Sequence, residues 1–154
     1  MSITISEYIS RNPVPDEGWY SALLVDAVDI GTIETPWGPE NKVLLLFELE
    51  SEDDNGNRFI VGKRFTRSYN EIAALRNFLE NWRGIKYTPA EVKHGVDLEN
   101  LIGMSATLYI AHNENEERTI VNIESIYPFK DTNGDVDHFA LKPSGDYDYG
   151  RNLI

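Results

Sequence analysis

Only one segment of the chain has helical periodicity, and it separates stretches that are rich in strand-forming residues. Ser68 and Glu71 have the spacing of a capping box. Behind them, apolar residues recur at intervals of three and four, namely Ile72, Leu75, Leu79 and Trp82, with Phe78 beside them. Gly84 stands where a helix C-cap glycine belongs. The pattern predicts a sheet protein in which one helix joins two strands.

Five strands are expected, at residues 19–30, 42–50, 58–65, 104–111 and 119–127. Asn55-Gly56 predicts a hairpin between the second and third strands, because both residues tolerate positive φ. An eleven-residue loop is expected at 31–41, and a short turn at 89–94. Gly62, inside the third strand, indicates a bulge or strong coiling that bends a sheet around a barrel corner.

The resulting order, β-β-β-α-β-β, predicts an all-β fold with one helix, the OB-fold, which is a five-stranded, partly open Greek-key barrel. Another small β-barrel or an α+β sandwich is the alternative. A length of 154 residues fits one domain with appended ends. We expect an N-terminal arm at 1–18, the OB-fold domain at 19–128, and an acidic C-terminal tail or surface wrap at 129–154.

The charge of the chain is unevenly distributed. The formal net charge is −12, which for the chain as a whole disfavours a polyanionic ligand. Residues 58–83, however, carry a net charge of +4, against −10 for residues 1–57 and −6 for residues 84–154. Oligonucleotides bind OB-folds on the second and third strands and the adjoining loops. The basic segment therefore falls where this fold holds its ligands.

Single-stranded nucleic acid requires cations for its phosphates and flat side chains for its bases. We expect a nucleic-acid-binding face formed by Trp37, Arg58, Lys63, Arg64, Arg67, Tyr69 and Arg83. Three alternatives stay open. The aromatic residues of the third strand are either core or ligand-facing. Trp37 is either a lid on the barrel or an exposed stacking platform. The helical Arg76 and Arg83 either bind ligand or are only solvated or paired with Glu80.

Other classes of function find no support in the sequence. The chain has no cysteine, which excludes disulfides, thiolate metal sites and cysteine nucleophiles. Its three histidines, His94, His112 and His138, lie far apart in sequence. No Ser-His-Asp arrangement, phosphate-binding loop or metal-ligand cluster is apparent in the sequence. We therefore expect neither an enzyme nor a bound metal or cofactor.

Several short motifs run through the central part of the chain. They are Thr35-Pro36-Trp37-Gly38 with Lys42-Val43, Lys63-Arg64-Phe65-Thr66, Leu75-Arg76 with Leu79-Glu80 and Trp82-Arg83-Gly84, and Asp97-Leu98 with Leu101-Ile102-Gly103. Over residues 18–128 they resemble a family of small phage-encoded OB-fold proteins. These proteins are found among replication and recombination genes and are assigned as single-stranded-DNA-binding proteins. The resemblance implies ligand contacts at Trp37, Lys63, Arg64 and Arg83.

Two functions therefore compete. The first is non-specific binding of single-stranded DNA, of the phage replication and recombination type, by the face of the second and third strands. The alternative is an OB-fold protein-interaction module that uses its acidic surface in a phage assembly or inhibitor role. The tail Asp146-Tyr147-Asp148-Tyr149, ending in Leu153-Ile154, loosely resembles the C-terminal tip of bacterial single-stranded-DNA-binding proteins. This likeness indicates a protein partner for the tail, and a plain solvated tail is the alternative.

The sequence contains no signal for a membrane. The N-terminus lacks the basic region and apolar stretch of a signal peptide. The longest apolar run, residues 43–47, is far shorter than the roughly 20 residues that span a bilayer. We expect a cytoplasmic protein, in the host cytoplasm if it is phage-encoded.

Overall fold

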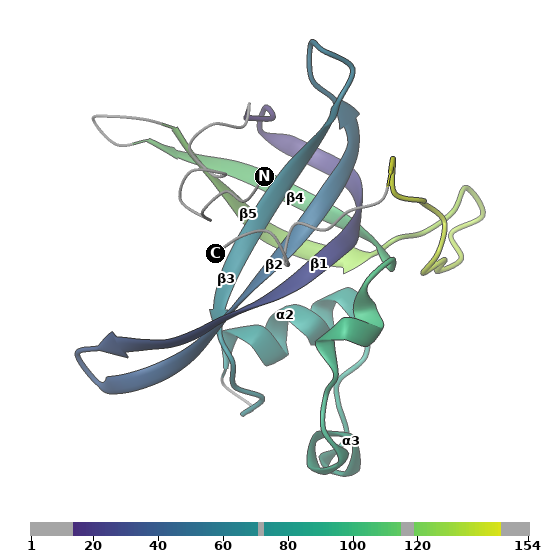
Figure 1. The fold of residues 1–154 in the computed structure, drawn as a ribbon. Coiled ribbons are helices and arrows are strands. Elements are labelled where there is room, and N and C mark those ends of the chain that lie inside the picture. Colours follow the sequence, from purple (N-terminus) through teal and green to yellow (C-terminus); the bar gives the residue numbers. More distant parts are fainter. Residues whose placement is uncertain (1–13, 71–72, 115–118, 146–154) are drawn as a thin grey trace.

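A computed structural model describes residues 14–70, 73–114 and 119–145 (Figure 1). The strands are β1 (Gly18–Thr35), β2 (Gly38–Glu52), β3 (Arg58–Thr66), β4 (Ser105–Glu114) and β5 (Thr119–Pro128). The main helix, α2 (Ala74–Arg83), is followed by the short α3 (Pro89–His94) and the 3₁₀ helix η1 (Leu98–Leu101). The predicted order of strands and main helix is confirmed, and α3 lies where a short turn was predicted.

The strands form one antiparallel sheet in the order β3-β2-β1-β4-β5. Within the described residues, no ladder joins the edge strands β3 and β5, so the sheet is not closed as a barrel. A mostly β fold with one main helix is thus confirmed, whereas the OB-fold barrel itself is not. The two edges nevertheless approach each other, because the Lys63 ammonium on β3 donates to the Ile123 carbonyl on β5 at 2.7 Å.

The connection between β1 and β2 differs from the prediction. Instead of a loop at 31–41, both strands continue to a two-residue turn, and the hairpin projects from the body of the molecule at the lower left of Figure 1. The Thr35 hydroxyl donates to the Gly38 carbonyl at 2.6 Å and accepts from the Trp37 amide at 3.2 Å. The prediction of a long loop was wrong. Residues 31–41 have no apolar alternation that would indicate strands, and it is backbone pairing between β1 and β2 that extends them.

The sheet buries apolar side chains on both of its faces. Alternate residues of β2 point to opposite sides, so that Val43 and Phe47 lie in the larger core and Leu44 and Leu46 in a smaller cluster. The larger core also holds the buried side chains of α2, which are Leu75, Phe78, Leu79 and Trp82. Figure 1 shows α2 at one end of the curved sheet. Burial on both faces explains the continuous apolar run at 43–47.

The predicted start of α2 is wrong, and its predicted end at Gly84 is confirmed. The helix begins at Ala74, and its N-cap residue Ala73 receives no side-chain cap among the described residues. The capping box predicted from Ser68 and Glu71 was therefore wrong in placing the helix start, and residues 71 and 72 lie outside the described part. The C-cap is confirmed, because Gly84 adopts the left-handed conformation with φ +78° and donates to the Glu80 carbonyl.

Residues 129–145 fold back against the sheet. Over these residues the C-terminal segment is a surface wrap rather than a free tail. The Ser105 amide donates to the His138 carbonyl at 2.6 Å, and the Leu141 amide donates to the Ser105 hydroxyl at 3.0 Å. The Leu141 side chain packs on the smaller apolar cluster. The acidic tip at 146–154, for which a protein partner is predicted, lies outside the described residues.

Candidate nucleic-acid interface

Trp37 occupies the tip of the β1–β2 hairpin. Its side chain is 90% exposed, so it does not cover the sheet as a lid. Pro36 restricts the backbone before it, and the Thr35 hydroxyl holds its amide, so the turn keeps the indole outside the body. An exposed, positioned tryptophan is the kind of group on which a nucleic-acid base can stack. The exposure of Trp37 contradicts the lid alternative, and the stacking platform stays a prediction.

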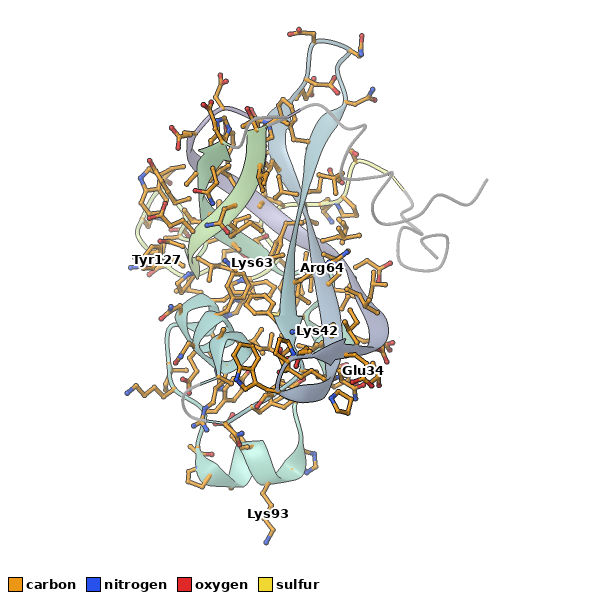
Figure 2. All side chains as sticks on the ribbon, turned by 90° about the vertical axis from the view of Figure 1, so that its left-hand side faces the viewer. Glu34, Lys42, Lys63, Arg64, Lys93 and Tyr127 are labelled. Atoms are coloured by element: carbon orange, nitrogen blue, oxygen red, sulfur yellow. The ribbon has the colours of Figure 1, made fainter. Side chains whose placement is uncertain are left out.

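Arg64 lies on the outward face of β3, opposite Leu44 of β2. It is exposed, and it forms no hydrogen bond or ion pair with the described residues. Lys42, two positions along β2 on the same face, donates to the Thr66 hydroxyl at 2.6 Å and lies 3.6 Å from a Glu40 oxygen. Figure 2 shows Arg64 and Lys42 close together along this side.

Lys42 was not among the predicted site residues. Its outward position on the second strand, next to the basic third strand, was the signal in the sequence that could have identified it.

Arg67 follows directly after β3. Its amide donates to the Asn41 carbonyl at 2.8 Å, which continues the pairing of the two strands. Its exposed guanidinium lies 3.9 Å from a carboxylate oxygen of Asp29. An exposed ion pair of this length contributes at most about 1 kcal/mol, so a phosphate could compete for the arginine. We call Trp37, Lys42, Arg64 and Arg67 the hairpin face.

Lys63 points to the other side of β3, as the predicted alternation of this strand requires. Its ammonium donates to the Ile123 carbonyl at 2.7 Å and to the Asn122 side-chain oxygen at 3.3 Å. Burial lowers the pKa of Lys63, and the Glu124 carboxylate opposes part of that shift. Lys63 thus bridges the edges of β3 and β5 through contacts that a ligand would have to replace (Figure 2).

Arg58 has a structural partner. Its guanidinium donates to a Glu48 carboxylate oxygen at 2.9 Å and to the Lys142 carbonyl at 2.9 Å. Glu48 is completely buried on β2, and the Ser144 amide donates to the same Glu48 oxygen at 3.0 Å. Arg58 therefore neutralises a buried carboxylate and fastens the C-terminal segment to the sheet.

The helical arginines are also paired. Arg76 lies 3.3 Å from a Glu80 oxygen, as one of the predicted alternatives states. Arg83 pairs instead with Glu91 at 3.0 Å and stacks over the Tyr87 ring, 4.2 Å from its centroid. Hydrogen bonds from the Thr88 amide and from the Arg83 guanidinium lower the pKa of Glu91. The lowered pKa favours the ionised carboxylate that pairs with Arg83.

The aromatic residues of the third strand belong mainly to the core. Phe65 is buried beside Phe78 of α2, and Phe59 is half-buried against the same cluster. Tyr69 also packs on this cluster, and its hydroxyl has no hydrogen-bond partner among the described residues. Stacking surfaces for bases must therefore come from other elements.

The +4 charge of residues 58–83 is largely balanced in space. Four of its six basic residues form ion pairs, namely Arg58, Arg67, Arg76 and Arg83. Lys63 and Arg64 form none with described residues, and of these two only Arg64 is exposed. Of the seven predicted residues, the hairpin face contains Trp37 at the projecting tip and Arg64 and Arg67 beside residues 41–44 of β2, while Arg58, Lys63, Tyr69 and Arg83 lie in structural contacts elsewhere.

Comparisons with protein-family models, curated proteins and solved structures found no significant match. Among the described residues, no three His, Asp or Glu side chains form a group that could hold a metal ion. No helix in the same residues is long and apolar enough to cross a membrane.

Proposed function

We propose that this protein binds single-stranded DNA without sequence preference, through the hairpin face, in a role of the phage replication or recombination type. The observation that carries the proposal is the exposed Trp37 at the tip of the β1–β2 hairpin, together with Arg64 on the neighbouring strand β3, which is exposed and has no partner among the described residues. Bases would stack on Trp37 while Arg64, Arg67 and Lys42 contact phosphates. Binding requires neither catalysis nor a cofactor.

We further propose that the sheet is an OB-fold left partly open between β3 and β5. The strand order supports this, because it places β3 and β5 at opposite edges that curve toward each other. The Lys63 bridge and the packing of α2 against both edges span the opening without a ladder. Residues of the second and third strands and the β1–β2 connection would then form the ligand face of that fold.

The acidic surroundings predict weak, salt-sensitive binding. Asp29 and Glu40 lie beside Arg67 and Lys42, so a phosphate must displace local carboxylates. One base stacked on Trp37 would contribute about 1–3 kcal/mol. Neutralising three phosphates would make the logarithm of the binding constant fall with the logarithm of salt concentration at a slope of about −2.

The test is a fluorescence and anisotropy titration of a labelled oligonucleotide at several salt concentrations. Arg64→Glu should weaken binding and reduce the salt slope to about −1.4, because one phosphate contact is lost. Lys93→Glu is the matched control, since Lys93 is an exposed lysine on α3, away from Arg64 (Figure 2). With an oligonucleotide of about 4 nucleotides, Trp37→Phe should remove most of the tryptophan quenching. Absence of binding at low salt, or equal losses for Arg64→Glu and Lys93→Glu, would contradict the proposal.

A protein-interaction module in a phage assembly or inhibitor role is the second candidate. At the opposite end of β2, a cavity of about 460 Å³ combines carboxylates with apolar side chains. Its lining includes Asp16, Glu52, Asp53, Asp54, Tyr20 and Phe59. This composition suits a basic segment of a protein partner. Capture of such a partner that is lost in Asp53→Asn, together with no response to oligonucleotides, would favour this function.

A protein partner for the acidic tip at 146–154 stays a prediction. If the tip competes with DNA, removing it should tighten oligonucleotide binding.

A further inference from the structure

Three aromatic side chains form a cluster on the outward side of β1, β4 and β5, away from the hairpin tip. The Trp19 and Tyr109 rings meet edge to face with centroids 5.0 Å apart, and the Trp19 and Tyr127 centroids are 5.8 Å apart. Trp19 is 59% exposed and Tyr127 is 50% exposed. Large aromatic side chains that cluster at a surface mark a site of interaction.

The register of the strands places six uncharged residues together on this surface. Residues directly opposite each other lie on the same face of a sheet. Trp19 lies opposite Tyr109, Ser21 opposite Thr107, Thr107 opposite Tyr127, and Tyr109 opposite Ser125. The six positions therefore carry aromatic rings and hydroxyls only, in a chain whose net charge is −12. A base that stacks on these six positions meets no carboxylate at the positions themselves.

Tyr127 also forms one wall of a cavity of about 360 Å³ between the end of α2 and the end of β5. The other walls include the side chains of Asn77, Asn81, Ile85, Lys86 and Pro128. This volume lies within the range of small-ligand sites. Amide groups can hydrogen-bond the polar edge of a base, and an exposed lysine can contact a phosphate.

Glu80, the one carboxylate in the cavity lining, is already engaged. It accepts from the Arg76 guanidinium at 3.3 Å and from the Tyr87 amide at 2.7 Å. Burial alone would raise the pKa of Glu80, but these hydrogen bonds outweigh it and lower the pKa. The negative charge is thus balanced by Arg76, which leaves Lys86 as the exposed charge of the cavity.

We propose that Trp19, Tyr109 and Tyr127, with the adjoining cavity, form a second base-binding subsite for single-stranded nucleic acid. This inference rests on the proposed function, because the strand would continue from the hairpin face. Figure 2 shows Arg64, Lys63 and Tyr127 in this order across the side that carries the edges of β3 and β5. A purely apolar protein partner would leave the amides and the ammonium of the cavity without partners, which favours a nucleotide.

The test compares oligonucleotides of about 4 and about 16 nucleotides, the limits of the site sizes of single OB-folds. Tyr127→Ala should weaken binding of the longer strand by about 5- to 150-fold, the loss expected for one stacked base, and leave the shorter strand unaffected. Tyr127→Phe keeps the ring and should bind normally. Phe139→Ala is the matched control, because Phe139 is an aromatic residue with 69% exposure outside the subsite.

A second variant keeps the test valid if Tyr127→Ala fails to fold. Lys86→Glu should weaken the longer strand alone, whereas Lys93→Glu, a change at another exposed lysine, should not.

The outcomes separate this inference from the proposed function. If Arg64→Glu weakens both lengths and neither Tyr127→Ala nor Lys86→Glu weakens the longer one, the hairpin face stands and the second subsite is wrong. Equal losses for both lengths would also overturn it. If sedimentation shows self-association that Tyr127→Ala abolishes, the cluster is an interface between copies. If the wild-type protein binds neither length, both proposals fail.

Discussion

Replacing Arg58 tests whether this arginine is structural rather than ligand-binding. Its partner Glu48 is 0% exposed, and only one of the two Glu48 carboxylate oxygens has hydrogen-bond partners among the described residues. Arg58→Met would leave this carboxylate buried with the Ser144 amide as its remaining donor. Breaking a buried ion pair from one side costs about 3–5 kcal/mol. Because the Arg58 side chain is 25% exposed, we expect the lower end, about 3 kcal/mol.

Urea unfolding followed by circular dichroism measures this loss. With a denaturant slope of about 2 kcal/mol per molar, the midpoint should fall by about 1.5 M. Arg64→Met is the matched control, because Arg64 has no partner in the described part of the chain, and it should change stability by less than about 0.5 kcal/mol. Replacing both Glu48 and Arg58 by methionine should recover most of the loss, since no buried charge is then left unpaired.

The same variants also report on binding. Arg58→Met should leave the salt slope of oligonucleotide binding unchanged under conditions where the protein is folded, whereas Arg64→Met should reduce it. The reasoning is refuted if Arg58→Met unfolds at the wild-type urea midpoint. It is equally refuted if the double variant is less stable than Arg58→Met alone.

Three further changes test other parts of the fold. Gly84→Ala forces a side chain into a left-handed conformation and should cost about 1–2 kcal/mol of stability. In a thermal melt it should lower Tm by about 2–8 °C, and an unchanged Tm would contradict the cap assignment. Trp82→Phe removes the indole N–H that donates to the buried Ser105 carbonyl at 2.8 Å. It should lower the free energy of unfolding, measured in urea, by about 1–3 kcal/mol. A loss under about 0.5 kcal/mol would show that this hydrogen bond is replaceable. Because the folded-state pKa of Glu80 is lowered, its contribution to stability is present at neutral pH and is lost as the pH falls through the acidic range. Glu80→Gln should therefore destabilise the protein at pH 7 and much less near pH 3, and a pH-independent difference would contradict the pairing with Arg76.

Local patterns were enough to predict the order of the elements. The spacing of Leu75, Leu79 and Trp82 predicts a helix because one apolar stripe must face the core. Asn55-Gly56 predicts the second hairpin because the turn depends on residues within it, and Gly56 indeed has φ +80°. Both features depend on interactions between residues close in sequence, which a single sequence displays directly.

Contacts between distant residues could not be predicted in the same way. The pairing of Arg58 with Glu48 and with the Lys142 carbonyl requires the register of two strands and the path of the C-terminal segment. The sequence predicts a loop around Trp37, because the polar strands of the extended hairpin are held by backbone hydrogen bonds, which leave no apolar period in the sequence. The aromatic cluster around Trp19 was missed because its members come from three strands.

The sequence by itself therefore determined the order of the five strands and the main helix, and the concentration of basic residues at 58–83. Only the tertiary structure decided which of those charges face solvent. Its strand register brings Glu48 to Arg58, and α3 brings Glu91 to Arg83, which leaves Arg64 as the exposed, unpaired arginine of that segment among the described residues. The physical reason is that periodicity and turn chemistry act over a few residues, whereas ion pairing and exposure depend on distances in space that the folded sheet sets.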